Sequence, residues 1–213
     1  MLAIKIPFKK QQFEAREEAI LDVVNRLLSE KGFDLMTMDD VADEVGVAKG
    51  SLYKHFSSKE KLAAAVMSRL LTETLDVLDG FPADWTAGKR LEEILRWTLQ
   101  HRLRGGVPHL PSTRGALQRA LLMNLEYLAL AWKVNKRFYA LAAEARKSGE
   151  INHDISDEVV VFTLYARSCD PTLEFLQRAG KLTDAQIVEA MVKTTFGGLF
   201  GGKKAAAIDK QPK

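Results

Sequence analysis

Apolar residues recur at helical spacing along most of the chain. Between Gln11 and Lys31 they fall three or four residues apart, and Gly32 then suits the end of a helix because glycine tolerates a positive φ. Similar apolar stripes follow side chains that can cap a helix, at Ser58, Thr86, Ser156 and Thr183. No β-type alternation persists. The sequence therefore predicts an all-α fold.

Two short helices stand out after the first one. Thr37 can cap a helix that runs to Gly46, and Lys49 starts another that ends near Phe56, with Leu52 on its inner face. Two short helices joined by a tight turn that contains glycine are typical of a helix-turn-helix. We therefore expect a three-helix DNA-binding domain over residues 1–61, followed by a helical bundle over residues 62–213 for ligand binding and dimerisation.

The second part of the chain gives less definite signals. Residues 112–147 keep a helical period over a length more typical of two helices than of one, without showing where they divide. Asp170 and Pro171 interrupt a later helix, because proline lacks the backbone donor and clashes with the preceding turn. Residues 203–213 are predicted to be a disordered tail.

Charge and cysteine content narrow the class of protein. The 213 residues carry a net charge of +3, and residues 1–62 hold ten basic and eleven acidic side chains, which counts against a nonspecific DNA coat. Residues 46–62, however, hold four lysines and a single glutamate, so the positive charge is local. One cysteine, no apolar run of spanning length and no secretory leader predict a cytoplasmic protein without disulfides.

The segment from Thr37 to Leu62 resembles the DNA-binding domain of the TetR (tetracycline repressor) family. The most specific part is Leu52-Tyr53-x-His55-Phe56-x-x-Lys59-x-x-Leu62. The resemblance extends from the first predicted helix to the start of the fourth, about 50 residues. It implies a one-component regulator, a repressor released from a palindromic operator by a small-molecule effector. It also implies that the residues facing DNA are Thr37, Lys49, Gly50, Ser51, Tyr53, His55 and Lys59.

Elementary chemistry agrees with these assignments. Gly50 lets the backbone approach a duplex, Lys49 can reach guanine acceptors, and Lys59 joins a positive charge to a helix N-terminus that favours phosphate. The alternative for Tyr53 and His55 is that they brace the third helix against the first. For the neighbouring Lys54 and Lys61 a solvated surface charge is the simpler interpretation.

An effector site is expected within the C-terminal helices. Its candidate residues are polar or aromatic groups on otherwise apolar faces: Trp97, His101, Met123, Asn124, Tyr127, Tyr165 and Cys169. A mostly apolar pocket with a few polar groups fits a small apolar or aromatic effector. The alternative is equally plain, since aromatic residues at helical spacing are usually core.

A homodimer is predicted from the apolar content of the last helices. These supply more apolar surface than one subunit can cover, and the expected interface residues are Val161, Leu164, Leu173, Leu176, Met191, Val192, Phe196, Leu199 and Phe200.

Two other classes of protein compete with this interpretation. An enzyme is disfavoured because the run from Gly197 to Lys203 lacks the Ser or Thr and the preceding strand of a phosphate-binding loop, and the four histidines show no metal spacing. No cofactor is therefore expected. An all-helical dimeric interaction module without DNA binding is disfavoured by the presence of Lys49, Tyr53 and Lys59.

Overall fold

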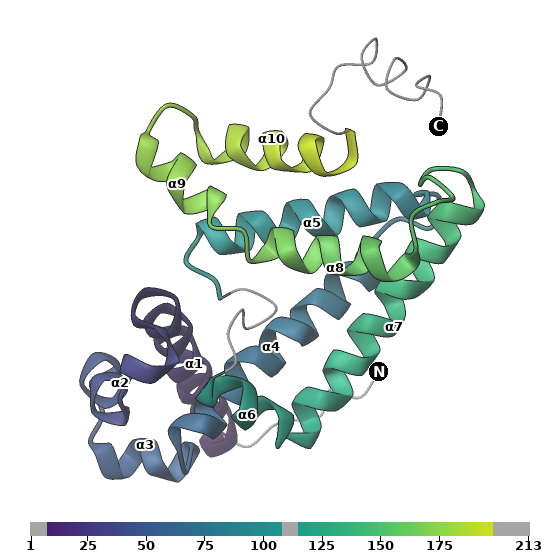
Figure 1. Ribbon diagram of the computed structural model, residues 1–213. Coiled ribbons are helices and arrows are strands. Elements are labelled where there is room, and N and C mark those ends of the chain that lie inside the picture. The colour runs from purple at the N-terminus through teal and green to yellow at the C-terminus, as the bar shows by residue number, and fades with distance from the viewer. Residues whose placement is uncertain (1–7, 108–114, 198–213) are drawn as a thin grey trace. The chain divides into compact units, whose positions relative to one another are not determined.

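The computed structural model describes residues 8–107 and 115–197, which form ten α-helices and no strand (Figure 1). The helices are α1 (Phe8–Leu35), α2 (Met38–Val45), α3 (Lys49–His55), α4 (Lys59–Gly80), α5 (Ala87–Leu103), α6 (Ala116–Leu122), α7 (Leu125–Lys147), α8 (Asp157–Ser168), α9 (Thr172–Ala179) and α10 (Asp184–Gly197). The all-α prediction is confirmed. The predicted tail at 203–213, with Leu199 and Phe200, lies outside the described residues.

Packing divides the chain into two compact units. The first holds α1 to α4, α6 and α7 as far as Arg137, and the second holds α5, the rest of α7 and α8 to α10. By packing, α4 therefore belongs with the three helices before it. The predicted boundary between residues 61 and 62 concerns which part touches DNA, and it stays a prediction.

The first unit is built around α1. Gly32 interrupts that helix with φ 75° and ψ 168°, as a residue without Cβ can, and turns the chain toward α2. Both α2 and α4 pack on α1, and α3 packs on α2. Their contribution to the core is a set of fully buried side chains: Ile20, Val24, Leu27, Met36, Val41, Leu52, Leu62 and Ala63.

The expected helix starts agree with the structure. The hydroxyls of Thr86 and Ser156 accept hydrogen bonds from the third backbone N–H of α5 and α8, and Thr183 does the same for α10. The long segment 112–147 divides at residues 123–124. There the Asn124 side chain accepts a bond from the backbone N–H of Tyr127, 2.9 Å away, and starts α7.

In the second unit α5 is the central helix, with α8, α9 and α10 packed against it (Figure 1). Arg96 of α5 pairs with Glu189 of α10 at 2.7 Å. Arg102 donates to the backbone carbonyl of Ser168 at the end of α8 and pairs with Glu174 of α9. Helix α8 ends at Ser168 and α9 begins at Thr172, so the predicted interruption at Asp170 and Pro171 is present.

Candidate nucleic-acid interface

The helix pair α2–α3 is fixed at both ends of its first member. The Thr37 hydroxyl accepts from the backbone N–H of Asp40 at 3.1 Å, and the Asp40 carboxylate accepts from the backbone N–H of Thr37 at 2.9 Å. This reciprocal capping box satisfies two amides that have no partner inside the helix. At the other end Gly46 takes φ 74° and ψ 36°, a left-handed conformation that lets the chain turn into α3 within two residues.

The helix α3 has one buried and one exposed side. Leu52 is fully buried, whereas Lys49, Gly50 and Lys54 are exposed. Tyr53 is 43% exposed. A Cβ added to Gly50 would meet no atom within 4 Å. The protein's own packing thus does not require glycine there, and a demand for space would come from a bound partner. Ser51 lies between the two sides and is half-buried.

Lys49 is held by an acid of the neighbouring helix. Its Nζ lies 2.6 Å from one carboxylate oxygen of Asp39 and 2.9 Å from the other. The hydrogen bond to Asp39 raises the pKa of Lys49 above its ordinary value. The ammonium therefore stays charged, and its position is tied to α2.

The structure does not place His55 on the exposed side of α3. Its ring stacks on Phe13 of α1 with centroids 4.1 Å apart, and Nδ1 lies 3.4 Å from the Glu17 carboxylate. The His55 side chain is only 5% exposed. Since α1 covers this ring, the geometry supports the bracing role that sequence reasoning kept as the alternative, rather than a direct contact with DNA. Phe13 and Glu17 lie too far away in sequence for local spacing to reveal this contact.

Lys59 has an intramolecular role as well. Its Nζ donates to the Phe33 carbonyl at 2.9 Å and lies 4.4 Å above the Phe33 ring. The bond ties the start of α4 to the end of α1. Because an ammonium has three N–H donors, a phosphate could still receive one of them. Lys61, in contrast, is exposed, as expected.

The acidic side chains of α2 are largely paired with cations. Arg26 of α1 pairs with Glu44, Lys31 of α1 with Asp40 at 3.3 Å, and Lys49 of α3 with Asp39. Within the part of the chain that the structure describes, Asp43 forms no ion pair. These contacts reduce the negative field that an acidic helix would otherwise direct at a phosphate backbone.

The seven predicted effector residues are distributed over both units. Asn124, Met123 and Tyr127 belong to the first, where Met123 is 85% exposed and Tyr127 is buried, which raises the pKa of its hydroxyl. Asn124 has a structural task as the cap of α7. Its role in capping explains a polar residue in an apolar segment.

The other four effector candidates lie in the second unit. Trp97 and His101 stack on one another along α5 with ring centroids 5.5 Å apart, as their spacing predicts. Tyr165 of α8 is buried, 5.7 Å from the Phe138 ring, and Cys169 follows at the end of that helix. The aromatic pairs therefore form part of this unit's own packing.

Most predicted dimer residues are buried inside their own unit, and the interface expected from them stays a prediction. These residues are Val161, Leu164, Leu173, Met191 and Val192, while Leu176 and Phe196 are half-buried. A side chain already covered by its own chain has little area left for a partner. The apolar residues that α8 and α9 do expose are Val159, Phe162 and Phe175, at 55%, 58% and 68%. The spacing of Ile155, Val159 and Phe162, at i, i+4 and i+7, was the available signal.

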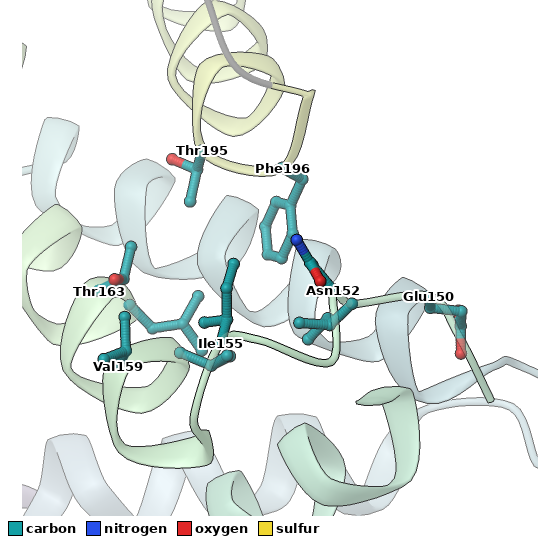
Figure 2. Close-up of a pocket in the computed structure, with 10 residues that line it drawn as sticks. Glu150, Asn152, Ile155, Val159, Thr163, Thr195 and Phe196 are labelled. Carbon is teal, nitrogen blue, oxygen red and sulfur yellow. The ribbon is translucent and has the colours of Figure 1, made fainter. Parts of the chain in front are cut away.

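A groove of about 300 Å³ lies beside this exposed face of α8 (Figure 2). Its walls come from the loop before α8, from α8 and from the end of α10: Glu150, Ile151, Asn152, Ile155, Val159, Val160, Thr163, Leu164, Thr195 and Phe196. The Glu150 carboxylate accepts from the hydroxyls of Thr86 and Ser148, and Thr195 donates to its own helix. Asn152 and Thr163 also line the groove, and its apolar contact comes from Ile151, Ile155, Val159, Val160, Leu164 and Phe196.

The geometry of α2 and α3 defines a helix-turn-helix protein with one polar, basic helix face open to solvent. Residues 20–66 match the family model described as bacterial regulatory proteins, tetR family. Residues 20–66 thus form a DNA-binding domain of the tetR type. The match indicates that this domain binds DNA.

Known relatives match part of the chain. The chain is 39% identical over 70 residues to the uncharacterized HTH-type transcriptional regulator YvdT of Bacillus subtilis, a match that covers 33% of this chain and 36% of YvdT. The chain thus matches about a third of the length of that relative.

In the part of the chain that the structure describes, no helix combines the length and apolar character needed to cross a membrane.

Solved structures share the fold over most of the chain. The fatty acid degradation regulator FadR from Bacillus halodurans aligns with a TM-score of 0.66 at 15% identity, covering 92% of this chain and 98% of FadR. The structure of AibR in complex with isovaleryl coenzyme A and operator DNA aligns with a TM-score of 0.58 at 22% identity, covering 85% and 98%. At these identities the likeness concerns the fold.

Proposed function

We propose that the protein is a one-component transcriptional repressor that binds a near-palindromic operator as a homodimer and leaves it when a small apolar or aromatic molecule binds. The observation that carries this proposal is the division of α3 into a buried side at Leu52 and an exposed side at Lys49, Gly50 and Tyr53. Acting on DNA, such a regulator works in the cytoplasm.

The exposed residues of α3 take two different tasks. Lys49 and Tyr53 read base edges in the major groove, where lysine suits guanine acceptors and the tyrosine offers a hydroxyl and a ring edge. Gly50 and Ser51 let the backbone come close to the duplex. Thr37 at the start of α2 and Lys59 at the start of α4 bind phosphates and set the register. His55 supports α3 from within.

The form that binds the operator contains a second copy of the chain. We place the partner on the exposed face of α8, where Val159 and Phe162 continue the apolar groove at Ile155 and Phe196. Burying such side chains releases about 25 cal/mol for each Å² removed from water. In the dimer the two α3 helices lie about 34 Å apart and enter successive major grooves.

Release of the operator follows if the dimer has two conformations, one that fits the DNA and one that does not, and the effector binds the second more tightly. AibR, which shares the fold, is described in complex with both isovaleryl coenzyme A and operator DNA. By analogy, this chain binds its effector among the C-terminal helices, near Trp97, His101 and Tyr165. Binding there favours a dimer whose α3 helices no longer match the groove spacing, and such coupling is usually worth about 1 to 3 kcal/mol.

The test begins with selection of duplexes from random-sequence DNA by the purified protein. We expect an enriched near-palindrome, and we expect Lys49→Ala to weaken its binding by about 1 to 3 kcal/mol while it keeps most of its affinity for a scrambled duplex. Lys54→Ala, an exposed lysine on the same helix, is the matched control. No enrichment, or equal losses on both duplexes for Lys49→Ala, would overturn the proposed base-reading role.

A further inference from the structure

We infer that Asp39 is a positioning residue that aims Lys49 at a base edge and keeps it from neighbouring phosphates. The inference rests on the proposed function, since it assigns a specificity role to a residue that does not itself read DNA. It draws on the geometry of the Lys49–Asp39 pair, on the rigidity of the helix that carries the acid, and on the donors that the lysine retains.

The pair has close, two-oxygen geometry. Lys49 Nζ lies 2.6 Å from Oδ1 and 2.9 Å from Oδ2 of Asp39, although both side chains are more than half exposed. A free lysine on the surface would sample many rotamers, and fixing them on binding costs entropy. Holding the ammonium before binding removes part of that cost, and at least one of its N–H donors remains for a guanine acceptor.

Asp39 lies in the first turn of α2, and the position of that turn is fixed. The capping box between Thr37 and Asp40 holds the first turn of α2, and Lys31 pairs with Asp40 at 3.3 Å from α1. The left-handed Gly46 sets the turn into α3. Asp39 therefore sits at a defined place relative to Lys49, as a supporting group for a reading side chain must.

The direction in which DNA binding changes when Asp39 is removed distinguishes two roles for Asp39: positioning Lys49 for the base, or only holding Lys49 away from DNA. If the pair had to break in the operator complex, removal of Asp39 would strengthen operator binding at least as much as nonspecific binding. If the pair persists in the operator complex, its removal frees Lys49 to seek phosphates on any sequence and disorders it at the base. Positioning therefore predicts that the variant gains on scrambled DNA and loses discrimination.

The experiment compares Asp39→Asn with Asp43→Asn, an exposed acid of the same helix that carries the same charge change. Both are titrated on the selected operator and on a scrambled duplex at several salt concentrations. We expect Asp39→Asn to lower the operator-to-scrambled affinity ratio by about fivefold, the scale of an exposed ion pair, and Asp43→Asn to leave the ratio unchanged. On scrambled DNA the salt slope should steepen by about 2 for a dimer, because two lysines gain phosphates.

A double variant tests whether Asp39 acts through Lys49. In a Lys49→Ala background, Asp39→Asn should no longer change the affinity ratio. A ratio that is unchanged or raised by Asp39→Asn, or an effect that persists without Lys49, overturns the inference. If the wild-type protein itself fails to distinguish the two duplexes, the proposed function fails instead. Urea unfolding of each variant shows that the ratio does not follow from lost folding.

Discussion

Helices α3 and α8 have the same two-sided construction but opposite outer faces. In α3 the buried side is apolar and the outer side carries Lys49, Gly50 and Tyr53. In α8 the buried side holds Val161 and Leu164, yet the outer side also exposes large apolar side chains, Val159 and Phe162. An exposed outer face that carries positive charge suits a phosphate-rich partner, whereas an apolar outer face suits another protein. The comparison agrees with the proposal that the first region binds DNA and the other binds a second copy.

The largest effect is expected from a charge on the outer face of α8. Phe162→Asp should leave the fold intact because the ring is 58% exposed, but it should dissociate the dimer. Losing one of two linked DNA contacts lowers apparent operator affinity by about 10² to 10⁴. Sedimentation and operator titration measure both effects.

Leu164→Ala is the matched test on the inner face of the same helix. Because Leu164 is buried, this variant should lose about 2 to 5 kcal/mol of unfolding free energy and remain dimeric while folded. A dimer that survives Phe162→Asp but not Leu164→Ala would restore the interface that sequence reasoning first predicted.

A loss of stability of the same size is expected inside α3. Leu52→Ala removes a fully buried side chain and should cost about 2 to 5 kcal/mol of unfolding free energy. Tyr53→Phe, one residue away on the outer side, should leave urea unfolding and the salt slope of DNA binding nearly unchanged. A large loss of stability in Tyr53→Phe would show that the tyrosine braces the core instead of reading DNA.

The start of α4 should give a moderate effect with two separable readouts. Lys59→Ala removes the bond to the Phe33 carbonyl and should lower the unfolding free energy by about 1 kcal/mol, whereas the exposed Lys61→Ala should not. If Lys59 also holds phosphate, the slope of log K against log salt falls by about 2 for the dimer. An unaltered slope would limit Lys59 to its structural role.

The smallest effect is a dependence of stability on acid. Bonds from the Thr37 hydroxyl and backbone, then from Lys31, lower the pKa of Asp40 below its ordinary value. A lowered folded pKa stabilises the protein above the unfolded value, near 3.9, and this contribution is lost as the pH falls through the folded pKa. Thr37→Ala should shift the Asp40 titration in NMR back upward and cost about 1 kcal/mol through the lost cap. An unchanged titration would contradict the capping box.

Helix starts and the two sides of α3 could be predicted from local sequence. Thr86, Ser156 and Thr183 act through hydrogen bonds to amides three residues away, and Leu52 differs sharply in polarity from Lys49. Capping bonds and the difference between two sides of a helix involve residues within about one helical turn, so they can be predicted from neighbouring residues in the sequence. The all-α class and the TetR-type motif follow from the same local information.

Tertiary packing alone decided which apolar face of α8 lies inside. Periodicity places Val161 with Leu164 and Val159 with Phe162, but a helix that is apolar on both sides does not state which side its own chain covers. The partners of His55 and Lys59 were equally hidden, because Phe13 and Phe33 lie 42 and 26 residues away along the chain. Contacts between distant segments depend on how whole helices pack, and that depends on the fit of many side chains at once.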